Sequence, residues 1–194
     1  MSPKSSLRFA VWRRRCRRPR GDVTRPTSDR VREAIFSSLG ERVVDATVLD
    51  LFAGTGSLGL EAASRGARAV TFVEQNRAAL AALEKNVADF VGRGGIKPVV
   101  IREDVFRYLR GKKPTPSPSA GGEPAGFELV FADPPYGEIA QQLLSAGIKA
   151  DWLVLESAKR DALTIPPEWT LVREGIYGDT RVSILRNNSL LFSG

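Results

Sequence analysis

The chain has 194 residues, 42% of them hydrophobic, which suffices for one sizeable core, and no apolar run approaches the roughly 20 residues of a membrane-spanning helix. It contains no histidine and a single cysteine, Cys16, which disfavours a zinc site, a histidine base and an intrachain disulfide. The N-terminus lacks the apolar stretch of a secretory signal. We therefore expect a cytoplasmic protein, most simply a monomer, without a membrane or metal partner.

The net charge of +7 is concentrated at the start of the chain. Residues 1–32 carry 11 Lys and Arg against 2 Asp, whereas residues 33–194 carry 18 Lys and Arg against 20 Asp and Glu. Such a cluster is typical of a polyanion-binding segment, because each phosphate contact releases condensed counterions. We expect residues 1–24 to form a basic arm or hairpin for nucleic acid, with a disordered solubilising tail as the alternative.

Residues 25–194 show the pattern of one α/β domain. Thr27 can cap a helix whose apolar residues recur at helical spacing as far as Leu39, and Gly40 is its natural stop. After it, β-branched runs alternate with helical stretches, which predicts a parallel sheet with helices on both faces. Strands are expected at 47–50, 69–74, 98–102, 127–132 and 152–156, and helices at 57–65, 77–90 and 139–147.

The end of the chain has a different pattern. Strands are expected at 170–175 and 181–186, with only a turn around 177–179 between them, which predicts an antiparallel hairpin. Residues 112–126 contain four prolines and hardly any apolar residue, so we expect a mobile loop without chemistry.

A glycine motif lies where the first strand passes into a helix. The segment from Asp50 to Gly59 contains the pattern G-x-G-x-x-G, which lets the backbone turn sharply and approach a ligand beside the helix N-terminus. Glu74 ends the next strand, 20 positions after Gly54, where an acidic side chain can accept hydrogen bonds from ribose hydroxyls. Together they indicate an adenosine-containing cofactor, either a nicotinamide dinucleotide or S-adenosylmethionine, with a tight structural turn as the alternative.

Asp104 follows the third strand and has two interpretations. Its side chain could accept from the adenine amine, or it could cap a helix. The residues expected to bind the cofactor from these motifs are Asp50, Phe52, Gly54, Gly56, Glu74 and Asp104.

The segment Asp133-Pro134-Pro135-Tyr136 follows the fourth strand, in the crevice where ligands bind in such sheets. A conjugated exocyclic amine of a base is a poor nucleophile, and two acceptors on its N–H groups can direct its lone pair at a methyl donor. We assign that role to the Asp133 carboxylate and the Pro134 carbonyl, and stacking on the base to Tyr136. The transfer needs alignment more than acid or base catalysis, which fits the absence of histidine.

Several alternatives follow from the same residues. A nicotinamide oxidoreductase would leave residues 133–136 unexplained, and an adenine-N6 methyltransferase of DNA would need a recognition domain for which the short arm leaves no room. Structured RNA already presents its bases, so RNA is the favoured substrate. An RNA adenine-N6 methyltransferase or an inactive RNA-binding assembly factor with the same fold stays possible. The arm residues expected to contact RNA are Trp12, Arg13, Arg14, Arg15, Arg17, Arg18 and Arg20.

Residues 50–59 and 133–136 together resemble the amino-methyltransferases of exocyclic nitrogens, and residues 25–36, 177–180 and 182–184 are similar to the bacterial small-subunit ribosomal RNA guanine-N2 methyltransferases of the RsmD type. This resemblance implies a Rossmann-like, mostly parallel seven-stranded sheet, S-adenosylmethionine as donor, and methylation of a guanine N2 in 16S ribosomal RNA within a small-subunit particle. It also implies that Thr27 and Arg30 lie over the cofactor pocket. Residues 9–15 replace the glycine-containing hairpin usual in that family.

Overall fold

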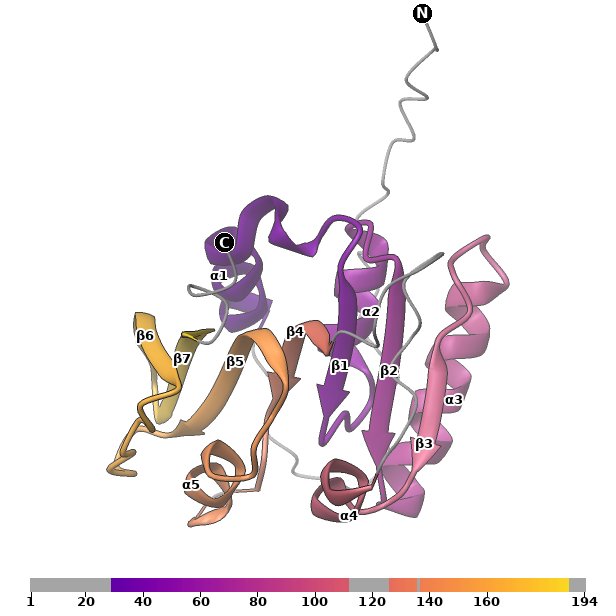
Figure 1. Cartoon of the computed structure of the whole chain (residues 1–194). Helices are drawn as coiled ribbons and strands as arrows, with labels where there is room; N and C mark the ends of the chain where they lie inside the picture. The colour runs from indigo at the N-terminus through magenta and orange to yellow at the C-terminus, as the bar shows by residue number, and fades with distance from the viewer. Residues whose placement is uncertain (1–28, 112–125, 136, 189–194) are drawn as a thin grey trace, which may run out of the picture.

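The computed structural model describes residues 29–111, 126–135 and 137–188, so that the predicted arm and nearly all of the predicted 112–126 loop lie outside the described residues. The described chain folds as one sheet with helices on both faces (Figure 1). The helices are α1 (Asp29–Leu39), a 3-10 helix η1 (Gly40–Val43), α2 (Ser57–Ser64), α3 (Arg77–Val91), α4 (Val105–Arg110) and α5 (Ile139–Leu144). The strands are β1 (Thr47–Leu51), β2 (Ala69–Glu74), β3 (Val99–Arg102), β4 (Phe127–Ala132), β5 (Ala150–Ala158), β6 (Trp169–Tyr177) and β7 (Thr180–Asn187).

The seven strands lie in the order β3-β2-β1-β4-β5-β7-β6. β1 to β5 are parallel, and β7 pairs antiparallel with both β5 and β6. The expected parallel sheet with helices on both faces and a C-terminal antiparallel hairpin is thereby confirmed. Because β6 runs parallel to β5, the turn at Gly178 lies at the same edge of the sheet as the ends of β1 to β5. We call this edge the carboxyl edge.

Among the described strands only β2 and β4 have the predicted bounds; the other strands and the helices α2, α3 and α5 differ from the prediction by one to three residues at one or both ends. Gly40 takes a φ of 56° and ends α1, as expected, but a 3-10 turn follows that was not predicted. α4 was not predicted either, although the alternative reading of Asp104 as a helix cap is correct. β5 is longer than the predicted 152–156 at both ends.

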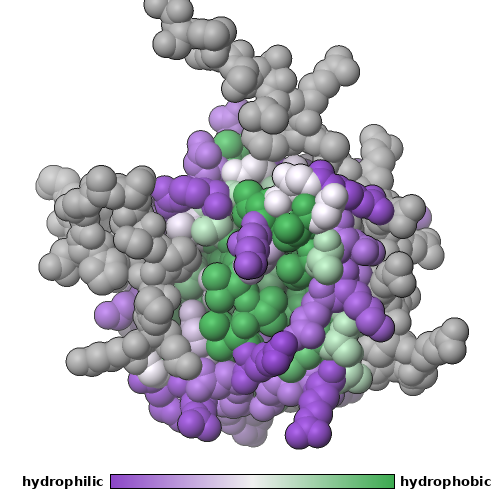
Figure 2. All heavy atoms as spheres, turned by 90° about the vertical axis from the view of Figure 1, so that its right-hand side faces the viewer, coloured by the Kyte–Doolittle hydropathy of each residue, from purple (hydrophilic) through white to green (hydrophobic). Residues whose placement is uncertain are grey.

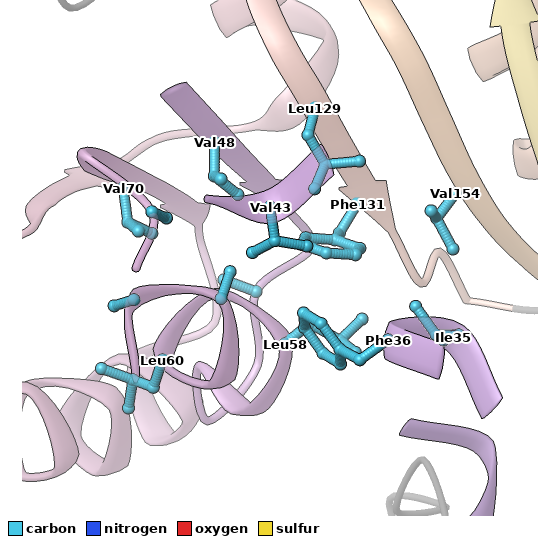
Figure 3. Close-up of a cluster of buried hydrophobic side chains, with 14 of the residues drawn as sticks. Ile35, Phe36, Val43, Val48, Leu58, Leu60, Val70, Leu129, Phe131 and Val154 are labelled. Carbon is cyan, nitrogen blue, oxygen red and sulfur yellow. The ribbon is translucent and has the colours of Figure 1, made fainter. Parts of the chain in front are cut away.

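The core lies in two layers, one on each face of the sheet. Successive residues of a strand point to opposite faces, so Val48 packs toward α1, α2 and α3 while Leu49 packs toward α4 and α5. Figure 3 shows the first layer, in which side chains from α1, η1 and α2 meet those of β1, β2, β4 and β5. Phe36 and Phe131 lie at its centre with ring centroids 5.5 Å apart, and truncating either to alanine should cost about 3–5 kcal/mol.

The β3 side of the sheet is an open edge. Among the described strands β3 pairs only with β2, and Val99 is 53% exposed. Figure 2 looks at this side of the molecule and shows hydrophobic side chains near its centre with hydrophilic ones around them. None of the helices within the described ranges combines the length and the apolarity needed to cross a bilayer.

Candidate active site

The glycine motif forms a turn at the end of β1 that ordinary residues would not adopt. Phe52, Gly54 and Gly56 have φ values of 55°, 56° and 80°, in the left-handed region that costs L-residues with a Cβ about 1–2 kcal/mol. The amide of Gly56 donates to the carbonyl of Ala53 across 2.7 Å, which closes the turn directly before α2. Phe52 adopts this unfavourable backbone conformation, and its ring packs edge-on against that of Phe106, with 6.4 Å between the ring centroids.

The three glycines of the motif serve different purposes. A Cβ on Gly56 would overlap the Leu83 side chain, and one on Gly59 would overlap the Phe72 ring and stand 3.0 Å from Asp50 Oδ2, so both permit close packing of α2. A Cβ on Gly54 would meet nothing closer than 3.9 Å. The backbone at Gly54 is therefore the part of the motif that a ligand can approach.

Asp50 lies beneath this turn and holds it in place. Its side chain is buried, and Oδ2 accepts a 2.9 Å hydrogen bond from the amide of Gly59 in the first turn of α2. Burial raises the pKa of Asp50 well above its usual range; the Gly59 hydrogen bond opposes that change, and the carboxylates of Asp133 and Glu74 add to it. The observed role of Asp50 is to position the turn, and its predicted contact with a cofactor stays a prediction.

Glu74 connects the two loops that frame the site. Oε2 accepts a 2.8 Å hydrogen bond from the amide of Gly54, and Oε1 accepts from the amides of Gln75 at 2.8 Å and Asn76 at 2.7 Å. Sequence reasoning anticipated the position of Glu74 but not these backbone partners. A carboxylate has about four acceptor positions, so one is left for a hydroxyl group.

Asn86 was missed by the sequence analysis. It lies on α3, is 2% exposed, and its Nδ2 donates a 2.9 Å hydrogen bond to the carbonyl of Thr55 within the glycine turn. A polar residue among apolar helix positions does not by itself indicate a functional role, because its hydrogen-bond partner cannot be identified from the sequence. The side chain therefore acts as a brace between α3 and the turn.

Asp104 caps α4, and it also faces a hollow. Its Oδ1 accepts a 2.9 Å hydrogen bond from the amide of Arg107, the geometry of an N-cap. The hollow lies beyond the ends of β2 and β3, beside Glu74. It is lined by Gln75, Ile101, Arg102, Glu103, Asp104 and Arg107.

Asp133 and Pro134 follow β4 at the carboxyl edge. Ala132 is the register partner of Leu51, which precedes Phe52, so Asp133 emerges beside the glycine turn. Its carboxylate reaches solvent, yet the protein around it reduces its hydration and raises its pKa to about 6. Pro134 is buried, and Tyr136 lies outside the described residues.

The remaining predicted site residues are not brought to the turn by any observed contact. Arg30 is exposed in the first turn of α1. Thr27 and the predicted RNA-binding residues of the arm lie outside the described residues. Their assignments stay predictions.

Three carboxylates thus surround the turn from neighbouring strand ends. The electrostatic influence of Glu74 and Asp133 on Asp50 shows that β1, β2 and β4 bring these groups within interaction range. The carboxylates of Glu74 and Asp133 favour a cationic group in the crevice. In the described ranges no three His, Cys, Asp or Glu side chains are arranged to share a metal ion.

Comparison with known proteins places this arrangement in context. The family model described as Conserved hypothetical protein 95 matches residues 10–186. The Ribosomal RNA small subunit methyltransferase D of Escherichia coli strain K12 is 35% identical over 176 residues, covering 86% of this chain and 82% of its own. The solved structure of the Escherichia coli protein yhhF has 34% identity and a TM-score of 0.72, covering 91% of this chain and 94% of its own.

A more distant structure shows the fold alone. The methyltransferase-like protein SMU.776, solved in complex with SAH, is 14% identical with a TM-score of 0.59, and the likeness covers 77% of this chain and 48% of that one. The expected class I methyltransferase architecture is therefore confirmed.

Proposed function

The chain belongs to the family described as Conserved hypothetical protein 95, together with the Ribosomal RNA small subunit methyltransferase D proteins, and on that premise we propose that it methylates ribosomal RNA. The donor is S-adenosylmethionine and the acceptor is the exocyclic N2 of a guanine in 16S ribosomal RNA. The observation that carries the proposal is the meeting of the Gly54 turn, Glu74 and Asp133 at adjacent strand ends. The reaction takes place in the cytoplasm, on a small-subunit particle.

The residues around the turn fit this donor. The open side of Gly54 admits the amino acid part close to the backbone, and the remaining acceptor position of Glu74 is available to a ribose hydroxyl. The hollow beside Asp104 has room for the adenine ring, with the second carboxylate oxygen of Asp104 as acceptor for its amine. The surrounding carboxylates match the positive charge of a sulfonium, and SMU.776 holds the demethylated product in the same fold.

The acceptor side of the proposal depends on Asp133 and Pro134. When bound, S-adenosylmethionine supplies an electrophilic methyl group. The Asp133 carboxylate and the Pro134 carbonyl each accept one N–H of the base amine and so fix the direction of its lone pair. A pKa of about 6 leaves Asp133 ionised at neutral pH, yet makes it a better acceptor for the amine proton released after transfer than an ordinary aspartate. Tyr136 stacks on the base.

The remaining parts of the chain complete the assignment. We propose that residues 1–24 form the RNA-binding arm, that 25–194 form the catalytic domain with 112–126 as a loop outside the chemistry, and that Thr27 and Arg30 cover the donor. The enzyme works as a monomer and needs no metal.

One experiment tests the proposal directly. The gene is deleted in its host, small subunits and deproteinised 16S RNA are purified, and each is incubated with the protein and isotopically labelled S-adenosylmethionine. Nucleoside mass spectrometry by position should show one N2-methylguanine restored, with the particle the better substrate. Labelled N6-methyladenine would assign the adenine alternative, and no transfer to either RNA, together with no heat of donor binding in calorimetry, would favour the inactive assembly factor.

A further inference from the structure

The loop that follows β5 lies at the same edge of the sheet as Asp133. β5 and β4 are parallel, and Leu155 is the register partner of Ala132, so Glu156 stands beside Asp133. The loop begins three residues further, at Lys159, about 10 Å along the strand direction at the usual rise per residue. It therefore lies at the same edge as Asp133, close enough to meet RNA whose target base is held there.

Backbone contacts hold this loop rigidly against the β6–β7 turn. The amide of Lys159 donates to the carbonyl of Asp179 across 2.7 Å. The guanidinium of Arg181 donates to the carbonyls of Asp161 at 2.6 Å and Lys159 at 2.9 Å. Asp161 in turn accepts from the amide of Ala158 at 3.2 Å. The backbone of residues 158–161 is thus held by the carbonyl of Asp179, by the side chain of Arg181 and by the side chain of Asp161.

Two cationic side chains project from this fixed backbone. Lys159 and Arg160 are both exposed, and within the part of the chain that the structure describes neither side chain takes part in a hydrogen bond or an ion pair. The acidic residues nearest this loop are Asp161, Glu174 and Asp179. Asp161 accepts from the amide of Ala158, Glu174 pairs with Arg181 at 3.6 Å, and Asp179 also has an interaction elsewhere. We call Lys159 and Arg160 the rim: the backbone that carries them is fixed before any ligand arrives, and their side chains are free to reach one.

We infer that Lys159 and Arg160 form a phosphate-binding site for the substrate RNA, next to the nucleotide that enters the active site. The inference rests on the proposed function for the identity of the polyanion. Phosphate contacts carry no sequence information but fix the register of the nucleic acid. This rim orients the RNA strand at the carboxyl edge, as a contact separate from the N-terminal arm.

The test compares two double variants with the same change of charge. K159A/R160A removes the rim cations, and K97A/K149A removes two exposed lysines that precede β3 and β5, at the opposite edge of the sheet. Within the described ranges those lysines also have no ion pair. Both variants change exposed side chains, and unchanged thermal unfolding should show that they fold.

The readouts are 16S RNA affinity as a function of salt, donor affinity by calorimetry, and steady-state methyl transfer. For K159A/R160A we expect a KM for RNA raised about five- to tenfold, kcat within twofold, unchanged donor affinity, and a salt slope smaller by about 1.4, the value for two phosphates on a single strand. K97A/K149A should match the wild type. If both variants lose affinity equally, or neither does, the rim is not a site. If the unaltered enzyme neither binds nor methylates 16S RNA, the proposed function has failed instead.

Discussion

The carboxylate of Glu74 accepts a 2.8 Å hydrogen bond from the amide of Gly54, a residue 20 positions earlier in the chain. With its bonds to the amides of Gln75 and Asn76, it ties the loop after β1 to the loop after β2. Glu74, at the end of β2, therefore holds the two loops of the donor site in place even without a donor. Its effect on the fold and its effect on donor binding can be measured separately.

Glu74→Ala should weaken both the fold and donor binding. Three backbone amides lose their acceptor; those of Gln75 and Asn76, which are exposed residues, can bond to water instead, and an unsatisfied donor at the less exposed Gly54 costs about 1–3 kcal/mol. We expect the melting temperature to fall by several degrees and the dissociation constant for S-adenosylmethionine to rise at least tenfold in calorimetry at a temperature where the variant is folded. The control is Glu41→Ala, which removes an exposed carboxylate in η1, before β1 at the opposite edge of the sheet; in the described chain Glu41 has no ion pair, and the change should alter neither quantity. An unchanged donor affinity in Glu74→Ala would contradict the role assigned to it.

Asp133 should give the methyl transfer rate its dependence on pH. Its pKa is raised to about 6, and only the ionised carboxylate can first accept the N–H hydrogen bond of the base amine and then take up the proton released after transfer. The transfer rate should be level above pH 7 and fall about tenfold by pH 5. The reduced hydration of Asp133 in the folded protein favours its protonated form. Its contribution to the free energy of unfolding therefore rises as the pH falls through 6 and declines as the pH rises through 6. The loss of rate at pH 5 is therefore not a loss of fold.

Asp133→Asn tests the same assignment. It keeps the shape of the side chain but cannot take up the amine proton, so we expect kcat to fall at least a hundredfold, the limb near pH 6 to disappear, and donor affinity to stay within a few-fold. Single-turnover rates from pH 5 to 8 measure this. A variant that kept both the wild-type rate and its pH profile would remove Asp133 from the mechanism.

The strands were predictable because each buried strand is a short, mostly apolar run, and β2 and β4 have the predicted bounds. β5 was underestimated because Asp151 and Ser157 interrupt the apolar pattern at its ends. α4 escaped prediction because its six residues mix apolar and basic side chains without a clear helical period, although Asp104 gave its start; the equally short α5 was predicted, but three residues too long. Local signals thus suffice for the sheet and fail where an element is short or polar.

The candidate site also has a part that the sequence predicts and a part that it does not. The glycine motif, Glu74 and Asp133 could be placed from spacing alone, because the carboxyl ends of parallel strands meet at one edge. The contacts of Asn86 with Thr55 and of Arg181 with the 159–161 loop join segments 31 and about 20 residues apart. Nothing in a residue's type indicates which distant carbonyl it will contact, so such braces emerge only from the structure.

Gly59→Ala tests whether the packing of α2 against the sheet controls donor binding, because Gly59 belongs to the packed part of the glycine motif and not to the part that a ligand can approach. A Cβ there overlaps the Phe72 ring and crowds Asp50, so α2 must move away from the sheet, at about 1–3 kcal/mol. We expect a lower melting temperature and weaker donor binding together. Gly92→Ala is the control, because Gly92 is exposed with a helical φ of −60° and its Cβ would meet the Ala88 carbonyl at 3.2 Å. The Asp89 carbonyl would lie at 3.9 Å, and the terminal turn of α3 can give by the few tenths of an ångström that the Ala88 contact requires, so the change should shift stability by no more than about 1 kcal/mol in denaturant unfolding.

Deletion of residues 1–23 should affect RNA and leave the donor alone. The deleted segment carries eight Lys and Arg, and if four of them contact phosphates the salt slope of RNA binding falls by about 3. Donor affinity and the melting temperature of the remaining domain should stay unchanged, because the glycine turn, Glu74 and Asp133 all lie in the domain. Filter binding of 16S RNA between 50 and about 300 mM salt measures the slope. An unaltered slope in the truncated protein would show that the arm does not contact RNA phosphates. The positive surface for RNA would then have to be the rim at Lys159 and Arg160.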